Sequence, residues 1–390
     1  MRNHPVDAKQ MFVAYLRLFG LALVAVLSGM TAYCADSDIT FTTLVTFNGT
    51  NGSLPMSGLM LAKDGNFYGT TYEGGAFMKD SDNGAGYGTA FKVAPEGKFV
   101  NLVSFRSGTH PCGNLVQGKD GNFYGTTLQG GKLGGGTVFR ITTDGRVTTL
   151  YSFGDYDEHG GVNTNGWAPD GLFEGSDGNF YGVTEGYGFS GGGTVFKITP
   201  EGKFTTLIAF SGKNIARPSI PLLVGKDGNF YGTINGELFK MTLNGTITTA
   251  FSYDGATGVL PVAGLIRGKD GKFFGLAACG SKGGSILRMN TNGKFTMLAK
   301  ISGECPSGEL MQATDGNFYG ANPLGGTNRN GTMFRLKADG TVATVFEFNG
   351  RNGNQPHVGL VQGKDGNLYG TTSGGFGSGG TIFRLALNLK

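Results

Sequence analysis

One short motif recurs seven times along this chain of 390 residues and constrains its fold more than any other feature. The motif consists of Asp-Gly, then Asn or Lys, then two residues that are aromatic or Leu, and a final Gly. Successive copies begin 43 to 57 residues apart, and a Leu stands five residues before each Asp. Repeats of this length indicate a fold built from similar supersecondary units. The copies begin at Asp64, Asp120, Asp177, Asp227, Asp270, Asp315 and Asp365.

Each repeat contains four short segments with the character of β-strands. The Asp-Gly pair forms a hairpin turn between the first two, because these residues tolerate the left-handed backbone of a tight turn. A Gly-rich loop leads to a third strand, such as 136–141, and a further Gly turn leads to a fourth, such as 147–153. Beyond residue 34, no segment has the ~3.6-residue periodicity of a helix. The sequence therefore predicts an all-β fold, a seven-bladed β-propeller with four antiparallel strands per blade.

The two ends of the repeat array complement each other. The last repeat stops after a third strand, residues 381–385, and the array opens with a fourth strand, residues 39–47, that has no preceding strands to pair with. We predict that strand 39–47 joins the C-terminal blade, because this closure leaves no open sheet edge. Residues 35–390 then form a single propeller domain.

The composition agrees with a folded chain that is rich in turns. Glycine accounts for 73 residues and proline for only 12, and the chain contains 30 Phe and 14 Tyr. Collagen requires abundant proline and a Gly at every third position, and disordered chains lack aromatic residues, so both classes are excluded. The formal net charge is +4 and no basic stripe is present. We therefore expect neither nucleic acid nor an anionic membrane as a partner.

Residues 1–34 have the features of a secretory signal peptide. Basic residues precede an apolar run at 18–27, which is too short to span a membrane, and small residues lead toward Cys34. We expect cleavage near Cys34 and a secreted protein, either extracellular or periplasmic. The true start, Met1 or Met11, stays open.

Three cysteines lie beyond this leader, Cys112, Cys279 and Cys305. In an exported protein, one disulfide and one remaining thiol is the simplest arrangement. Cys279 and Cys305 fall in loops on the same face of neighbouring predicted blades. We therefore predict a Cys279–Cys305 disulfide and a free thiol at Cys112.

The seventh repeat carries a distinctive set of residues: Gly359-Leu360, Gly363, Asp365-Gly366-Asn367, Tyr369-Gly370-Thr371-Thr372 and Gly380-Thr381-Ile382-Phe383. With its counterparts over about 39–390, this pattern resembles the GloVer tandem-repeat family of bacterial surface proteins, called "choice-of-anchor" because their C-terminal anchors vary. The resemblance implies an exported propeller and brings no established activity, substrate or catalytic residue. The sequence ends at the closing blade without an anchor, which favours a released or periplasmic protein.

Two kinds of loop define two faces of the predicted propeller. The Asp-Gly turns and the turns between third and fourth strands lie on one face, and they are short and nearly uniform. The loops between second and third strands, and those between blades, lie on the other face and vary. A rigid scaffold that varies its loops on one side carries function there, so we expect a ligand site on this variable face.

One position in the blade-to-blade loops is diversified. A Pro stands nine residues before the motif Asp in six repeats, and Ala168 followed by Pro169 occupies that place in the third. The residue just before varies, and we expect the seven such residues to surround the mouth of the central channel. They are Leu54, His110, Trp167, Arg217, Leu260, Cys305 and Gln355.

Six residues at or near this position are the predicted binding residues. Trp and Arg stack on sugar rings or anchor a partner, while His, Gln and Asp supply hydrogen bonds. Glu309, farther along its strand, would add another carboxylate. The alternative is a set of solvated loops that vary without function. The predicted residues are His110, Trp167, Arg217, Gln355, His357 and Asp170.

These features predict an exported, non-catalytic, monomeric propeller that binds an extracellular polysaccharide or a surface protein through its variable face. The alternative is a polysaccharide-cleaving enzyme, a lyase or a glycosidase, with its site at the channel mouth. The sequence contains no nucleophile elbow, zinc-binding helix or phosphate loop. Acidic runs at 80–83 and 155–158 lack the spacing of a calcium loop. We therefore predict no catalytic residue, metal or cofactor.

Overall fold

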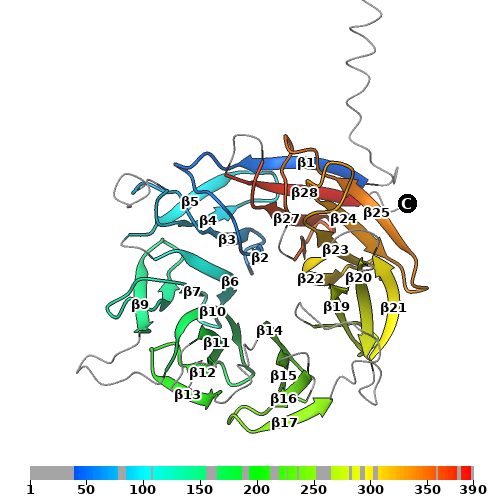
Figure 1. Cartoon of the computed structure of the whole chain (residues 1–390). Coiled ribbons are helices and arrows are strands. Elements are labelled where there is room, and N and C mark those ends of the chain that lie inside the picture. Colours follow the sequence, from blue (N-terminus) through cyan, green and yellow to red (C-terminus); the bar gives the residue numbers. More distant parts are fainter. Residues whose placement is uncertain are drawn as a thin grey trace, which may run out of the picture.

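A computed structural model describes residues 39–77, 85–106, 109–154, 165–186, 193–210, 219–225, 227–234, 237–251, 265–280, 283–289, 295–301, 306–356, 359–375 and 379–387. These residues form 28 strands in seven four-stranded antiparallel sheets, which surround a central axis (Figure 1). The predicted seven-bladed propeller is thus confirmed. The predicted signal peptide, residues 1–34, lies outside the described residues and stays a prediction.

The strands of each blade follow one another from the axis outward in the first six blades. Blade 1 contains β2 (Met60–Leu61), β3 (Phe67–Thr71), β4 (Thr89–Val93) and β5 (Phe99–Ser104). Blade 2 contains β6 (Pro111–Gln117), β7 (Phe123–Thr127), β8 (Thr137–Ile141) and β9 (Val147–Ser152). Blade 3 contains β10 (Trp167–Glu174), β11 (Phe180–Gly186), β12 (Thr194–Ile198) and β13 (Phe204–Ala209). Blade 4 contains β14 (Ser219–Val224), β15 (Phe230–Ile234), β16 (Glu237–Met241) and β17 (Ile247–Phe251). Blade 5 contains β18 (Ile266–Arg267), β19 (Phe273–Gly280), β20 (Gly283–Met289) and β21 (Phe295–Ile301). Blade 6 contains β22 (Ser307–Gln312), β23 (Phe318–Asn322), β24 (Thr332–Leu336) and β25 (Val342–Glu347). Blade 7 contains β26 (Val361–Gln362), β27 (Leu368–Thr372), β28 (Thr381–Leu387) and β1 (Ile39–Thr46).

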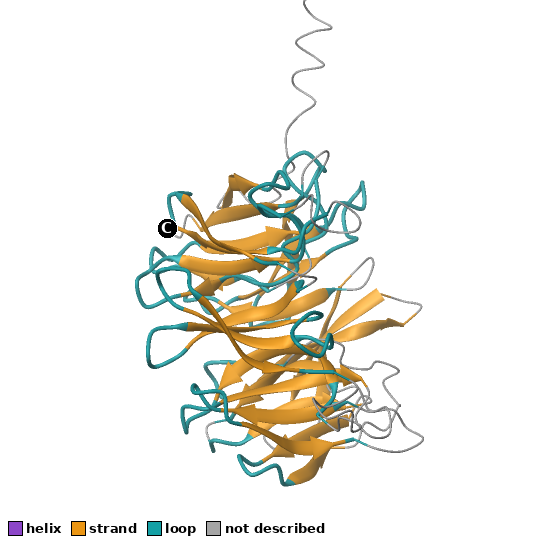
Figure 2. Ribbon diagram, turned by 90° about the vertical axis from the view of Figure 1, so that its left-hand side faces the viewer, coloured by secondary structure: helices purple, strands orange, loops and turns teal. Residues whose placement is uncertain are grey.

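The ring is closed by its first and last strands, as predicted. β1 pairs antiparallel with β28, from Ile39 opposite Leu387 to Thr46 opposite Thr381. Figure 1 shows β1 and β28 side by side at the rim, although they lie at opposite ends of the sequence. Figure 2 views the ring from its edge, where the strands run between two faces that carry the loops.

The aromatic pair of the motif forms the contacts between blades. Successive side chains of a strand point to opposite faces of the sheet, so Phe and Tyr of the second strand face different neighbours. Tyr68 of blade 1 stacks on Phe123 of blade 2 with ring centroids 4.1 Å apart, and Tyr124 of blade 2 stacks on Phe180 of blade 3 at 4.0 Å. The Gly that follows is required by packing, because a Cβ on Gly125 would lie 2.6 Å from the Phe139 ring.

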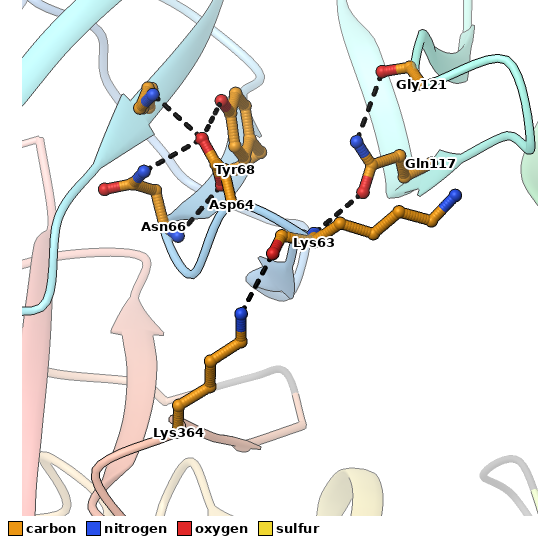
Figure 3. A network of polar contacts seen from close by, with 8 residues as sticks. Lys63, Asp64, Asn66, Tyr68, Gln117, Gly121 and Lys364 are labelled. Carbon is orange, nitrogen blue, oxygen red and sulfur yellow. Dashed lines mark hydrogen bonds and ion pairs between the residues drawn. The ribbon is translucent and has the colours of Figure 1, made fainter.

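The motif Asp organises a polar cluster in its turn, which we call the turn latch: Asp64, Asn66, Tyr68 and Lys92 in blade 1 (Figure 3). Asn66 donates its backbone N–H to Asp64 Oδ1 (3.0 Å) and its side-chain amide to Oδ2 (2.8 Å). The Tyr68 hydroxyl donates to Oδ2 (3.0 Å), and Lys92 Nζ lies 2.9 Å from the same oxygen. Burial raises the pKa of Asp64, but these contacts outweigh burial and hold the pKa well below its usual value.

The Asp, Asn and Tyr of the latch recur with the same three hydrogen bonds in six of the seven blades. Blade 5 differs, because Lys272 replaces the Asn and Phe274 replaces the Tyr. The motif Asp is therefore a structural residue that fastens the first three strands of a blade at one face.

Candidate functional site

In the four blades whose entry is described, blades 1, 2, 3 and 7, the innermost strand is entered on the variable face through a residue with positive φ that directly precedes a Pro. Leu54, His110, Ala168 and Gln355 have φ of 53°, 40°, 52° and 53°. Non-glycine residues rarely adopt this conformation, and it persists only where neighbouring structure holds it. The preceding blade supplies that support, since the backbone N–H of Ala168 donates to the Gly135 carbonyl at 2.8 Å.

The Pro and the Gly that opens the third strand of the preceding blade form a matched pair. Gly136 has φ of +100°, and a Cβ placed on it would lie 2.6 Å from Pro169 Cδ. Gly331 has the same φ, and its Cβ would lie 2.3 Å from Pro356 Cδ. Only glycine fits this approach, so the entries to β10 and to blade 7 are each fixed by residues of two blades.

In blade 3, the residue that precedes the innermost strand differs by one position from the residue that the sequence alignment predicts. Pro169 lies opposite Thr184, as Pro111 lies opposite Thr127, so Ala168 is the counterpart of His110. The aligned position in blade 3 is therefore Ala168, and Trp167 stands one residue earlier. The reason is a segment that is one residue shorter between the Pro and the motif Asp.

His110 is bound to the neighbouring blade. Its Nδ1 lies 3.0 Å from the Tyr72 carbonyl oxygen, and its ring stacks on the Tyr72 ring with centroids 4.6 Å apart. The Tyr87 ring lies 6.2 Å away. These rings form an aromatic cluster on the variable face, at the junction of blades 1 and 2.

The other described candidates lie in different blades. Trp167 and Asp170 belong to β10 of blade 3, where Asp170 Oδ1 would lie 3.4 Å from a Cβ on Gly113 of blade 2. Gln355 precedes blade 7, and its carbonyl accepts hydrogen bonds from the Ser373 backbone N–H and hydroxyl, both at 3.2 Å. The remaining two, Arg217 and His357, lie outside the described residues.

The cysteines are only partly described. Cys279 belongs to β19, while Cys305 lies outside the described residues, so the Cys279–Cys305 disulfide stays a prediction. Cys112 is a thiol whose Sγ donates to the Pro169 carbonyl at 3.2 Å. This bond links blade 2 to blade 3 beside the entry to β10.

A cleft of about 270 Å³ lies between blades 1 and 2. We call it the blade 1–2 cleft. The segment after β5 forms one wall, and strands β8 and β9 form the other. Its lining includes Ser104, Arg106, Thr109, Thr127, Phe139 and Thr149. The lining also includes Val103, Phe105 and Val147, so the cleft combines apolar side chains with hydroxyl groups and one guanidinium.

Arg106 is held at the rim of this cleft by an aromatic ring. Its guanidinium carbon lies 3.8 Å from the centroid of the Phe77 ring, which belongs to the loop between β3 and β4. Arg106 is exposed, so the stacked guanidinium retains N–H donors for a ligand. Sequence reasoning missed Arg106 and Phe77, because they lie in non-repeating loops; the only signal was an Arg and a Phe in the loops of one junction.

Glu309 has a different environment, on the innermost strand β22 of blade 6. The Glu309 Cβ lies close to blade 7, because a Cβ placed on Gly359 would be 3.2 Å from it. Burial raises the pKa of its carboxyl to about 7, and no hydrogen bond or ion pair to it is found among the described residues. Such a carboxyl can exchange a proton near neutral pH.

Seven similar blades, closed by the N-terminal strand and bearing dissimilar loops on one face, define a tandem-repeat β-propeller. Matches to the Gloeobacter/Verrucomicrobia repeat cover residues 29–162, 157–282 and 233–390, so the chain belongs to this repeat family. This assignment confirms the resemblance inferred from the motif. No curated protein is significantly similar to the chain.

Solved structures share the fold at low sequence identity. Streptogramin B lyase is 16% identical with a TM-score of 0.62, over 90% of this chain and 98% of that chain. A catalytically inactive virginiamycin B lyase from Staphylococcus aureus with quinupristin is 18% identical with a TM-score of 0.63, over 90% and 99%. An extracellular domain assigned to the hybrid two component system BT3049 of B. thetaiotaomicron is 14% identical with a TM-score of 0.55, over 87% and 40%. At these identities the likeness establishes the fold alone.

Among the described residues, no helix has the length and apolar character needed to cross a bilayer. Within the same residues, no group of three or more His, Cys, Asp or Glu side chains is arranged to hold a metal ion.

Proposed function

We propose that this protein is an exported, monomeric propeller that binds an extracellular polysaccharide or a surface protein through its variable face. The observation that carries the proposal is the blade 1–2 cleft, with Arg106 stacked on Phe77 at its rim. The same junction holds His110, a predicted binding residue that lies beside the rings of Tyr72 and Tyr87. Trp167, Asp170, Gln355, Arg217 and His357 are proposed to extend the binding surface around this face.

The cleft offers both apolar surface and hydrogen-bonding groups, a combination that a sugar ring can use. Small-molecule sites combine an apolar wall with a few fixed polar groups. Val103 and Val147 supply apolar surface, while Arg106 and Thr109 supply hydrogen-bond donors. A volume of about 270 Å³ suits one sugar ring of a longer chain, which would continue over the loops.

A glycan array with the purified protein tests this proposal. We expect binding to a restricted set of glycans, and the double variant Arg106→Ala, His110→Ala should weaken it by about 10-fold or more, as for loss of central interface residues. Lys337→Ala is the control, because Lys337 is exposed in the outer turn of blade 6, away from the cleft. Equal binding by wild type and the double variant would refute the cleft as the site. A parallel pull-down of surface proteins separates a protein partner from a glycan.

The second candidate function is cleavage of a polysaccharide, and Glu309 is the observation that favours it. A carboxyl with a pKa of about 7 suits a general acid or base at neutral pH. Incubation with uronic-acid polymers should then yield unsaturated products that absorb in the ultraviolet, and Glu309→Gln should abolish their formation. If wild-type protein releases no product from uronic-acid polymers or neutral glycans, the enzymatic alternative is wrong.

A further inference from the structure

The face opposite the variable loops carries lysines in an unusual electrostatic setting. The residue directly before the motif Asp is Lys in five repeats. Four of these lysines are described and all are exposed: Lys63, Lys119, Lys269 and Lys364. We call them the lysine ring, because each lies in the turn between the innermost and second strands of its blade, nearest to the axis.

Each ammonium of the lysine ring reaches the next blade. Lys364 Nζ donates to the Lys63 carbonyl at 2.9 Å, which joins blade 7 to blade 1 (Figure 3). Lys63 Nζ donates to Gly118 of blade 2, and Lys119 Nζ donates to Ser176 of blade 3, each at 3.4 Å. Lys269 Nζ donates to Ala313 of blade 6 at 3.1 Å. These contacts hold the side chains in place at the inner rim.

The carbonyl contacts leave the charge of the ring uncompensated. Two of the neighbouring Asp carboxylates pair instead with other lysines, Asp64 with Lys92 of the third strand at 2.9 Å and Asp270 with Lys272 of its own turn at 3.3 Å. None of the ion pairs formed between described residues includes a ring lysine. The ends of the innermost strands add one basic residue, Arg267, and one acidic residue, Glu174, whose charges offset each other.

An ammonium has three N–H donors, and the ring lysines use one or two of them on carbonyls. Each lysine therefore keeps at least one donor and its full charge for a ligand. The described charges lie in blades 7, 1, 2 and 5, one in each, and the three in adjacent blades suit an anion with several charged groups in a row. Lys364, Lys63 and Lys119 form a continuous arc over blades 7, 1 and 2.

We propose that the lysine ring binds an acidic polysaccharide that carries carboxylate or sulfate groups. Sites for single-stranded nucleic acid add exposed aromatic side chains for base stacking. The aromatic residues of these turns are buried instead, as Tyr124 and Tyr369 are, each with no exposed surface. The inference is independent of the blade 1–2 cleft and gives the protein a second binding surface on its opposite face.

Binding of dextran sulfate and polygalacturonate, with neutral dextran as the uncharged control, tests the inference over a series of salt concentrations. Binding by three ring lysines that displace counterions should give a log–log salt slope of about −2 to −3. The triple variant Lys63→Gln, Lys119→Gln, Lys364→Gln should lose most of that slope and weaken binding by about 10-fold or more. The charge-preserving triple Lys→Arg variant should bind like wild type, and its thermal unfolding reports whether the fold is kept.

The matched control removes three charges from the same face but farther from the axis. Lys98→Gln, Lys203→Gln, Lys337→Gln alters exposed residues of the outer turns and should leave binding nearly unchanged. Equal loss in both triple variants, or no binding of either acidic polymer at low salt, would overturn the inference. Tighter binding of single-stranded DNA than of both acidic polymers would overturn it in favour of nucleic acid. Arg106→Ala, His110→Ala should retain acidic-polymer binding, which separates this surface from the proposed cleft.

Discussion

Replacement of Asp177 by Asn should destabilise the propeller by about 1–3 kcal/mol, the range for hydrogen bonds to a charged group. The Asp177 carboxylate accepts from the Asn179 amide (2.7 Å) and the Tyr181 hydroxyl (2.9 Å), and it pairs with Lys197 at 2.8 Å. An Asn side chain has a single acceptor oxygen, so either the Asn179 backbone N–H or the hydroxyl of the buried Tyr181 would face an NH2 group instead of an acceptor. The Asp177 side chain is 26% exposed, and solvent therefore screens only part of the ion pair. The shift in the urea midpoint at constant m-value measures the change.

The chain contains its own controls for this experiment. Asp270 occupies the same turn in blade 5, where Phe274 lacks the hydroxyl and Lys272 replaces the Asn. Asp270→Asn should therefore cost less than Asp177→Asn. Asp144→Asn alters a 61%-exposed turn residue on the same face and should change stability by about 0.5 kcal/mol or less. Equal destabilisation by all three substitutions would refute the account of the turn latch.

Two further predictions concern the pH dependence of stability and the packing around a glycine. Burial raises the pKa of Asp177, but Lys197, Asn179 and Tyr181 together lower it below the unfolded-state value of about 4, so the ionised latch stabilises the fold above that value. Stability should fall as the pH drops below about 4, and Asp177→Asn should reduce this loss in urea titrations at several pH values; an unchanged acid dependence would contradict the role of Asp177. Gly125→Ala should destabilise by about 1–3 kcal/mol, because its Cβ would lie 2.6 Å from the Phe139 ring, whereas Gly134→Ala, with nothing within 4 Å, tests the backbone strain alone.

Most of the fold follows from the repeat, because its residues make the contacts that define a blade. Asp64 and Gly65 set the turn, Phe67 and Tyr68 reach opposite neighbours, and Gly69 makes room for Phe91. The closing pair of strands was also predictable, since the ends of the array are incomplete halves of one blade.

The candidate site was less predictable, because it depends on loops that do not repeat. Arg106 and Phe77 meet across a distance of 29 positions in segments of different length, and no periodic signal links them. The sequence alignment matched Trp167 with His110, whereas the structure matches Ala168 with His110. The segment between Pro169 and the motif Asp is one residue shorter than in blade 2, and this shifts the match by one position. The lysine ring had a sequence signal, a Lys before Asp-Gly. Whether the neighbouring Asp neutralises that Lys depends on the ion pairs that the Asp forms, which the sequence does not show.

Hydrogen–deuterium exchange with a bound glycan from the array tests the central claim, that the variable face carries the binding site, most directly. We predict slower exchange in 103–106, 109–110 and 127–137, which line or border the blade 1–2 cleft, with no change in the outer turns at 94–98 and 199–203. Protection confined to those outer turns, or absent from both cleft segments, would contradict the account.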